Sequence, residues 1–227
     1  MEDLRDLKKE LVEYGKRIIQ RGLVVGPGGN ISIRYEDTIY LSPSGFAFDE
    51  VTEDLLVGVN LYTEDIVEGN LKPTCEIAMH LGCYRVRPDI RAIIHTHPPL
   101  ATGVVSAGVK LRPLTAELVA LVGSIPILDY ILPSTKELAD AVSKAIKDHN
   151  AVLMINHGCL TVGANLREAF YRTEIIEDSA RLLIAAMTVG KPRFLTPEEE
   201  EAIKKLEAEN YRKSLLAELP KNQKPET

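Results

Sequence analysis

The sequence has 227 residues, 45% of them hydrophobic, which is enough to bury one sizeable core. Its formal net charge of -6 argues against a general nucleic-acid or anionic-membrane binder and favours a small-molecule partner. The three cysteines, Cys75, Cys83 and Cys159, form no paired framework and fit a reducing compartment. The sequence shows neither a signal-peptide core nor an apolar run of bilayer length, so we expect a cytoplasmic protein.

Apolar residues at helical spacing predict a first helix over residues 3–21, with Gly22 as its C-terminal stop. The glycine-rich segment 26–30 opens into a predicted hairpin with strands at residues 31–34 and 39–41. A second small-residue loop, 42–45, follows this hairpin. Each loop alone is the pattern of an ordinary turn. Glycine also lets backbone N–H groups approach an anion closely, so the two loops can also cradle a phosphate.

Residues 73–76, Pro-Thr-Cys-Glu, predict the start of a helix with Thr74 as its N-cap and Glu76 in its first turn. An acidic side chain near the positive end of a helix is common on structural grounds alone. Glu76 is also a candidate active-site base, and the amides around Thr74 and Cys75 could hold a phosphate at the helix N-terminus.

Residues 91–97 predict a buried strand that ends in His-Thr-His. Alternate side chains of a strand share a face, so His95 and His97 can grip one ion, although an isolated pair is as typical of an ordinary strand end. His157 closes a second apolar run, at residues 151–158. Three imidazoles that leave a position open for water or substrate indicate a catalytic zinc centre rather than a closed structural one.

The remaining segments predict helices and strands that surround these sites. Helices are expected at residues 100–107, from the cap Ser134 to 148, and from the cap Asn165 to 189. A C-terminal helix is expected at about 197–217, after the cap Thr196, with a disordered tail over 221–227. Strands are expected at residues 56–62, 125–128 and 159–163.

Five motifs in this order resemble the class II aldolase/adducin family: Gly29-Asn30-Ile31-Ser32, Ser42-Pro43-Ser44-Gly45, Pro73-Thr74-Cys75-Glu76, His95-Thr96-His97 and Asn156-His157-Gly158. The match covers roughly residues 3–190 and is most like the branch of zinc-dependent L-fuculose-1-phosphate aldolases. The resemblance implies an α/β fold over residues 1–227, a single three-layer α/β/α domain with a mostly antiparallel central sheet. It also implies a homotetramer with active sites at subunit interfaces.

Carried over by motif, the resemblance implies that His95, His97 and His157 bind one zinc ion per subunit, with another divalent metal left open. It implies that Glu76 is the acid/base and also touches the metal. The residues implied to hold a substrate phosphate are Gly29, Asn30, Ser44, Gly45, Thr74 and Cys75. Tyr211 is the candidate for a C-terminal tyrosine brought over the site.

Two segments depart from the family pattern. The phosphate loop has Pro27 and Gly28 where fuculose aldolases usually show hydroxyl residues, so fewer side-chain donors meet the phosphate. A tyrosine expected ahead of the Gly123 loop is missing, and Thr115, Ala116 and Glu117 occupy that region. The second departure bears on which aldehyde the enzyme accepts.

The resemblance implies a lyase that reversibly cleaves a ketose 1-phosphate to dihydroxyacetone phosphate and an aldehyde, with the metal as Lewis acid. The expected substrate is L-fuculose 1-phosphate or a related pentulose or 5-deoxypentulose 1-phosphate. Sister enzymes on the same scaffold are the alternatives: a sugar-acid-phosphate decarboxylase, a pentulose-5-phosphate 4-epimerase or a methylthioribulose-phosphate dehydratase. Epimerases usually carry aspartate in place of Glu76. A non-catalytic adducin-like module predicts eroded metal ligands, and all three histidines are present.

Overall fold

A computed structural model describes residues 3–218 of the chain, so the tail predicted to be disordered, 221–227, lies outside the described residues. The described strands form one sheet in the order β4-β3-β2-β1-β5-β8-β7-β6. Its strands are β1 Asn30–Tyr35, β2 Thr38–Leu41, β3 Val57–Asn60, β4 Ile66–Glu68, β5 Ala92–Thr96, β6 Ile127–Leu128, β7 Ala151–Met154 and β8 Gly158–Gly163. Neighbouring strands are antiparallel except β6 and β7, which confirms the mostly antiparallel sheet.

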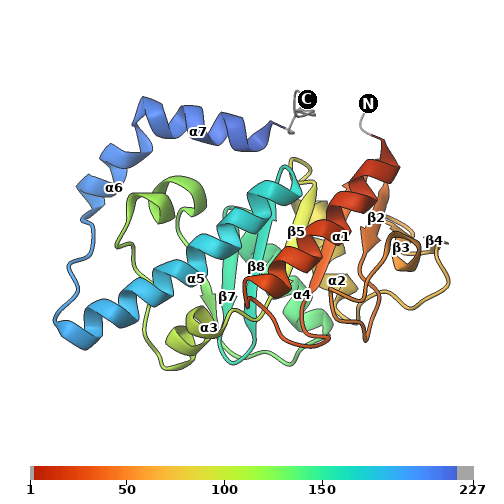
Figure 1. The fold of residues 1–227 in the computed structure, drawn as a ribbon, viewed down its shortest axis with the longest axis horizontal. Helices are drawn as coiled ribbons and strands as arrows, with labels where there is room; N and C mark the ends of the chain where they lie inside the picture. The colour runs from red at the N-terminus through yellow and green to blue at the C-terminus, as the bar shows by residue number, and fades with distance from the viewer. Residues whose placement is uncertain (1–2, 219–227) are drawn as a thin grey trace, which may run out of the picture.

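Helices cover both faces of this sheet, which confirms the three-layer α/β/α prediction (Figure 1). The helices are α1 Leu4–Gln20, α2 Ile77–Val86, α3 Pro99–Ser106, α4 Lys136–Ile146, α5 Leu166–Val189, α6 Pro197–Lys204 and α7 Glu207–Ala217. Two short pieces are a 3₁₀ turn at Glu53–Leu55 and a π-helix at Leu118–Val122. One apolar cluster packs α2 and α4 on one face, and two more pack α1, α3 and α5 on the other.

Strand alternation explains the two layers. Ile31 and Ile33 of β1 pack with α1 and α5, whereas Ser32 between them points to α2, where it meets His80 and Tyr84. In β5 the same rule sends Ile93 to the α2 side. The face that carries α2 therefore also receives the alternate polar side chains of β1 and β5.

Two of the predicted helix caps are wrong. Thr74 lies before the helix, because its backbone N–H donates to Ser42 O at 3.3 Å, and Glu76 takes the N-cap position of α2 instead. Ser134 has a left-handed backbone with φ +64°, and Thr135 caps α4 by accepting from Leu138 N at 3.3 Å. A tertiary backbone contact at Thr74 and a left-handed backbone at Ser134 therefore accompany helix starts that lie two residues and one residue later than predicted.

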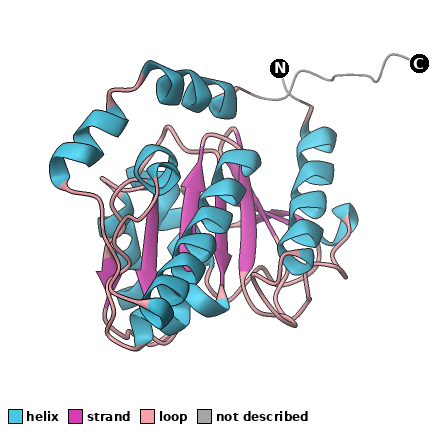
Figure 2. Ribbon diagram, turned by 60° about the vertical axis from the view of Figure 1, so that its left-hand side comes forward, coloured by secondary structure: helices cyan, strands magenta, loops and turns pink. Residues whose placement is uncertain are grey.

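The single C-terminal helix predicted at about 197–217 is two helices, α6 and α7, which lie across one end of the strands (Figure 2). The chain breaks at Leu206, whose backbone is extended with φ -64° and ψ 125°. The end of α7 is held at the start of α5, because the Asn165 amide donates to the carbonyls of Leu216 and Ala217 at 2.9 and 3.2 Å.

Candidate metal centre

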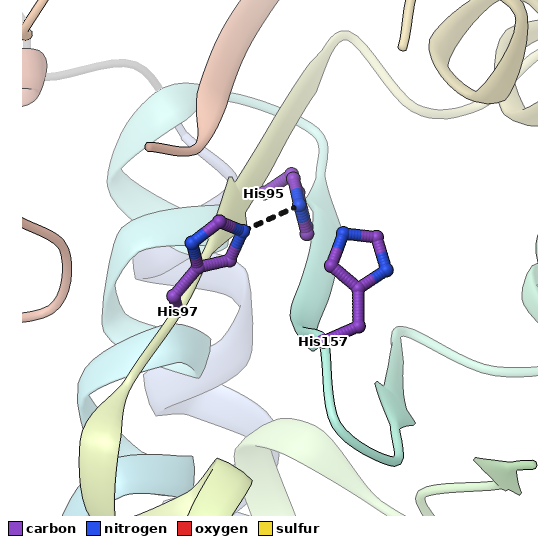
Figure 3. Close-up of side chains that lie close together, drawn as sticks. All are labelled: His95, His97 and His157. Atoms are coloured by element: carbon purple, nitrogen blue, oxygen red, sulfur yellow. Dashed lines mark hydrogen bonds between the residues drawn. The ribbon is translucent and has the colours of Figure 1, made fainter. Parts of the chain in front are cut away.

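The three predicted metal ligands come together at one end of the central strands (Figure 3). His95 lies in β5 and His97 directly after it, while His157 lies in the turn between β7 and β8. Pairing of β5 with β8, with Thr96 opposite Cys159, brings that turn beside the end of β5. One ligand atom from each histidine lies within 4.8 Å of the other two, which is close enough to share one ion.

The orientation of the His95 ring and the burial of His97 suit metal binding. His95 Nδ1 is 2.9 Å from the carbonyl oxygen of Cys159 and donates its proton to it, which fixes the ring with Nε2 toward the cluster. His97 Nε2 lies 3.2 Å from His95 Nε2. Burial, followed by the charges of His95 and His157, lowers the pKa of His97 to about 4. His97 is therefore neutral at pH 7, as a ligand must be.

Glu76 lies against this cluster from the end of α2. Its Oε2 is 3.2 Å from His95 Nε2, and its Oε1 is 3.2 Å from His157 Nε2. The side-chain amide of Asn30 donates to Oε2 at 2.9 Å. Burial alone would raise the pKa of Glu76, but the contacts with His157, His95 and Asn30 outweigh it and hold this pKa below its usual range. Glu76 is therefore a buried, ionised carboxylate.

The donor set fits a divalent metal ion. Glu76 Oε1 and His157 Nδ1 are among the buried polar atoms that have no hydrogen-bond partner within residues 3–218. Such atoms are rare in native proteins, and a cation beside them would satisfy the carboxylate. Three imidazoles and a carboxylate are also the donors that zinc and similar divalent ions take in catalytic sites.

The predicted phosphate loop at residues 26–30 packs directly on the histidines. Gly29 has φ +72°, and a Cβ built on it would lie 2.6 Å from the carbonyl oxygen of His95. A Cβ on Gly28 would lie 3.0 Å from His97 Nδ1. Only glycine allows this approach and backbone conformation at Gly29, so the loop is fixed close to the metal-binding cluster.

Gly158 offers a test of how tightly the cluster is packed. A Cβ at this position would lie 2.4 Å from Thr96 O and 2.7 Å from His97 Cδ2, so Gly158→Ala must displace both histidine-bearing segments. We expect a loss of about 1–3 kcal/mol in the free energy of unfolding, together with weaker metal binding. Gly103→Ala in α3 is the matched control, because a Cβ there meets nothing within 4 Å. Urea unfolding and metal content of both variants check this, and an unchanged Gly158→Ala protein would contradict it.

The other predicted phosphate segments lie side by side. Ser44 N donates to Lys72 O at 3.0 Å, and Thr74 N donates to Ser42 O at 3.3 Å, so residues 42–45 run next to 72–74. Thr74 is buried, and its hydroxyl accepts from Glu76 N at 3.3 Å, which ties this segment to the carboxylate. The exposed members of the predicted phosphate set are Ser44, Gly45 and Cys75. Their role in binding phosphate stays a prediction.

Tyr211 does not join the cluster within this chain. It lies on α7, which packs on α5 and α6, and 65% of the residue is exposed. Glu117, in the segment where a tyrosine is missing, directly precedes the π-helix Leu118–Val122. A contribution of Tyr211 to the site stays a prediction.

Sequence reasoning missed a row of buried polar residues behind Glu76. Asn30 uses both ends of its amide, because its Oδ1 is also 2.5 Å from His80 Nε2. His80 Nδ1 is 2.7 Å from Ser32 Oγ, which is 2.9 Å from the Tyr84 hydroxyl. His80 follows Glu76 by four residues, one helical turn, and this spacing was the signal available in the sequence.

A second buried carboxylate supports the chain just after His97. Glu177 of α5 accepts from the backbone N–H groups of Leu100 and Ala101 at 3.0 and 2.8 Å, so it caps the start of α3. Pro98 and Pro99 leave this helix start without a side-chain cap of its own. Glu177 thereby fixes the direction in which the chain leaves His97.

Comparison with known proteins identifies the family. The model of the Class II Aldolase and Adducin N-terminal domain matches residues 9–184, and this chain belongs to that family. It is 38% identical over 205 residues to a 5-deoxy-D-ribulose 1-phosphate aldolase of Bacillus thuringiensis, covering 89% of this chain and 95% of that protein. It is 31% identical over 198 residues to a 3-oxo-tetronate 4-phosphate decarboxylase of Pectobacterium atrosepticum, covering 85% and 91%.

Solved structures agree with the fold. An L-fuculose 1-phosphate aldolase superposes with a TM-score of 0.84 at 33% identity, covering 93% of this chain and 98% of that one. The family is metal-dependent and its aldolases are lyases, and the cluster of His95, His97 and His157 could hold a metal ion. Within residues 3–218, none of the helices combines the length and apolar character needed to cross a bilayer.

Proposed function

We propose that this protein is a metal-dependent aldolase that reversibly cleaves a ketose 1-phosphate to dihydroxyacetone phosphate and an aldehyde. The observation that carries the proposal is the position of the Glu76 carboxylate, 3.2 Å from two histidines of the candidate metal centre. A base this close to a metal can act on the same substrate atoms that the metal polarises.

The chain's own residues supply the remaining steps. When bound by His95, His97 and His157, a divalent ion supplies a Lewis acid for the electrons of the broken carbon–carbon bond, typically worth several kcal/mol. In the synthetic direction Glu76 takes a proton from the carbon of dihydroxyacetone phosphate that becomes the nucleophile, and in cleavage it returns one. The residues at 29–30, 44–45 and 74–75 hold the phosphate, so that remote binding energy positions the reacting carbon.

Zinc is the ion we propose, because a neutral three-histidine set with a nearby carboxylate suits it. We also propose a cytoplasmic homotetramer whose active sites lie at subunit interfaces. The supporting observation is the exposure of apolar residues on the second half of α5, where Leu182, Ile184, Met187 and Val189 are 39–88% exposed. In such an assembly the exposed Tyr211 is available to the site of a neighbouring copy.

Release of dihydroxyacetone phosphate from a panel of ketose 1-phosphates tests the activity. The panel holds L-fuculose, ribulose and 5-deoxyribulose 1-phosphates, and the last is the first choice because the Bacillus thuringiensis relative is named for it. We expect release that stops on chelation and returns with zinc. The ratio of kcat/KM among the three substrates then ranks the aldehydes.

The second candidate is decarboxylation of a sugar-acid phosphate, which the Pectobacterium atrosepticum relative favours. A zinc-loaded protein that releases no dihydroxyacetone phosphate but releases carbon dioxide from 3-oxo-tetronate 4-phosphate would overturn the aldolase proposal. In that case the proposed metal site would be kept, and the proposed reaction would be a decarboxylation instead of an aldol cleavage.

A further inference from the structure

Five buried polar groups form a continuous row that ends on Glu76. They are Tyr84, Ser32, His80, Asn30 and Glu76, and each is at most 7% exposed. Successive polar atoms along the row are 2.9, 2.7, 2.5 and 2.9 Å apart. The row connects β1 with α2 over more than two helical turns, from Glu76 to Tyr84.

The direction of each hydrogen bond follows from the chemistry of the groups. An ionised carboxylate only accepts, so Asn30 must turn its NH₂ to Glu76 and its carbonyl oxygen to His80. A carbonyl oxygen only accepts, so the proton of the His80 ring is on Nε2. Burial lowers the pKa of His80 to about 3, and the ring is therefore neutral with Nδ1 as an acceptor.

The same logic continues outward from His80. Ser32 must donate its hydroxyl proton to His80 Nδ1, so its oxygen accepts from the hydroxyl of Tyr84. In each of the four hydrogen bonds the donor is thus the group farther along the row from Glu76. Hydrogen bonds that run in one direction polarise one another. Because each group donates one bond and accepts one, reversing any bond would reverse the others as well. The Asn30 carbonyl would then face the Glu76 carboxylate, and the two oxygens would repel each other.

We infer that His80, Ser32 and Tyr84 are positioning residues that hold Asn30 as a donor to Glu76 and so fix which oxygen of Glu76 is the base. Asn30 donates to Oε2, whereas Oε1 has no hydrogen bond within residues 3–218 and faces His157 Nε2 at 3.2 Å. Oε1 is therefore the oxygen that exchanges a proton with the substrate. The assignment of Oε1 as the base rests on the proposed aldolase function. The direction of the hydrogen bonds along the row does not depend on that function.

Nuclear magnetic resonance of the ¹⁵N-histidine-labelled protein reads the row without any substrate. We expect His80 to carry its proton on Nε2 and to keep that form across roughly pH 5 to 8, where an ordinary histidine titrates. Its signals are assigned by their loss in His80→Gln. A proton on Nδ1, or a charged ring in this pH range, would overturn the direction of the row.

Steady-state kinetics then tests the positioning role in metal-loaded protein. His80→Leu removes the donor to Asn30, and we expect kcat to fall about 10- to 100-fold with KM and bound metal near wild type. Glutamine carries an NH₂ near the position of Nε2, so His80→Gln should recover most of kcat. Ser32→Ala should lower kcat less than His80→Leu and mix the two ring forms of His80, and it replaces His80→Leu if that variant does not fold.

The outcomes separate the two proposals. Unchanged kcat in His80→Leu and Ser32→Ala, or the same loss in His80→Leu and His80→Gln, would overturn the positioning role. A wild-type protein that loads zinc and cleaves none of the ketose 1-phosphates would overturn the proposed function instead. The ring form of His80 would still decide the direction of the row in that case.

Discussion

A His157→Ala protein is expected to lose its metal ion and its aldolase activity together. His157 supplies one of three imidazoles whose ligand atoms lie within 4.8 Å of one another, and alanine leaves two. Loss of a partner outside the ligand shell typically costs 10- to 100-fold in affinity or activity, so loss of a ligand should cost more than about 100-fold. Metal content after dialysis and turnover on the same sample measure the effect.

His149→Ala is the matched control for this experiment. His149 is also a partly buried histidine, but its ring is 3.0 Å from Ser124 Oγ and belongs to no metal cluster in the described part of the chain. It should keep its metal and its activity. A His157→Ala protein that is fully active and loaded with metal would remove His157 from the site.

The sequence was sufficient to predict that the three candidate metal ligands lie together, because their signals are local. His95 and His97 end one apolar run, where the alternation of strand residues predicts a shared face, and His157 follows a second apolar run. The sheet and its two helical layers followed from the order of such runs and from the family motifs. Pairing of the two apolar segments in one sheet is then enough to bring the three rings together.

What the sequence did not predict depends on contacts between distant segments. The row behind Glu76 requires β1 to pair with β5 so that Asn30 lies opposite His95, and α2 to pack on that face. Thr74 is drawn out of the helix by Ser42, 32 positions earlier. Such contacts leave no periodic pattern, so His80 reads from sequence as one more histidine inside a helix.

Weak or unusual elements were missed for a different reason. The strand Ile66–Glu68 has three residues, all exposed, and therefore shows no alternation of buried and exposed positions. The π-helix Leu118–Val122 is an apolar run too short to distinguish from a strand or a helix. The break at Leu206 falls in a run of charged residues, where no apolar stripe marks the end of one helix and the start of the next.

Glu76→Gln is expected to lower kcat by about 100- to 10,000-fold, the range typical for a general acid or base. Glutamine keeps the shape of the side chain and can still accept from Asn30, but it cannot take a proton from the substrate. The three histidines remain, so the protein should still bind zinc. Glu137→Gln, in the exposed first turn of α4, is the control and should retain wild-type kcat.

Metal content decides what the loss of activity means. Retained zinc with lost turnover assigns the proton transfer to Glu76, whereas near-normal turnover would remove Glu76 from the mechanism. Loss of zinc together with turnover would instead make the carboxylate a required ligand, as its 3.2 Å distances to His95 and His157 allow. Glu76→Asp separates these two roles further, because it keeps the charge but withdraws it by one methylene from Asn30 and from the histidines.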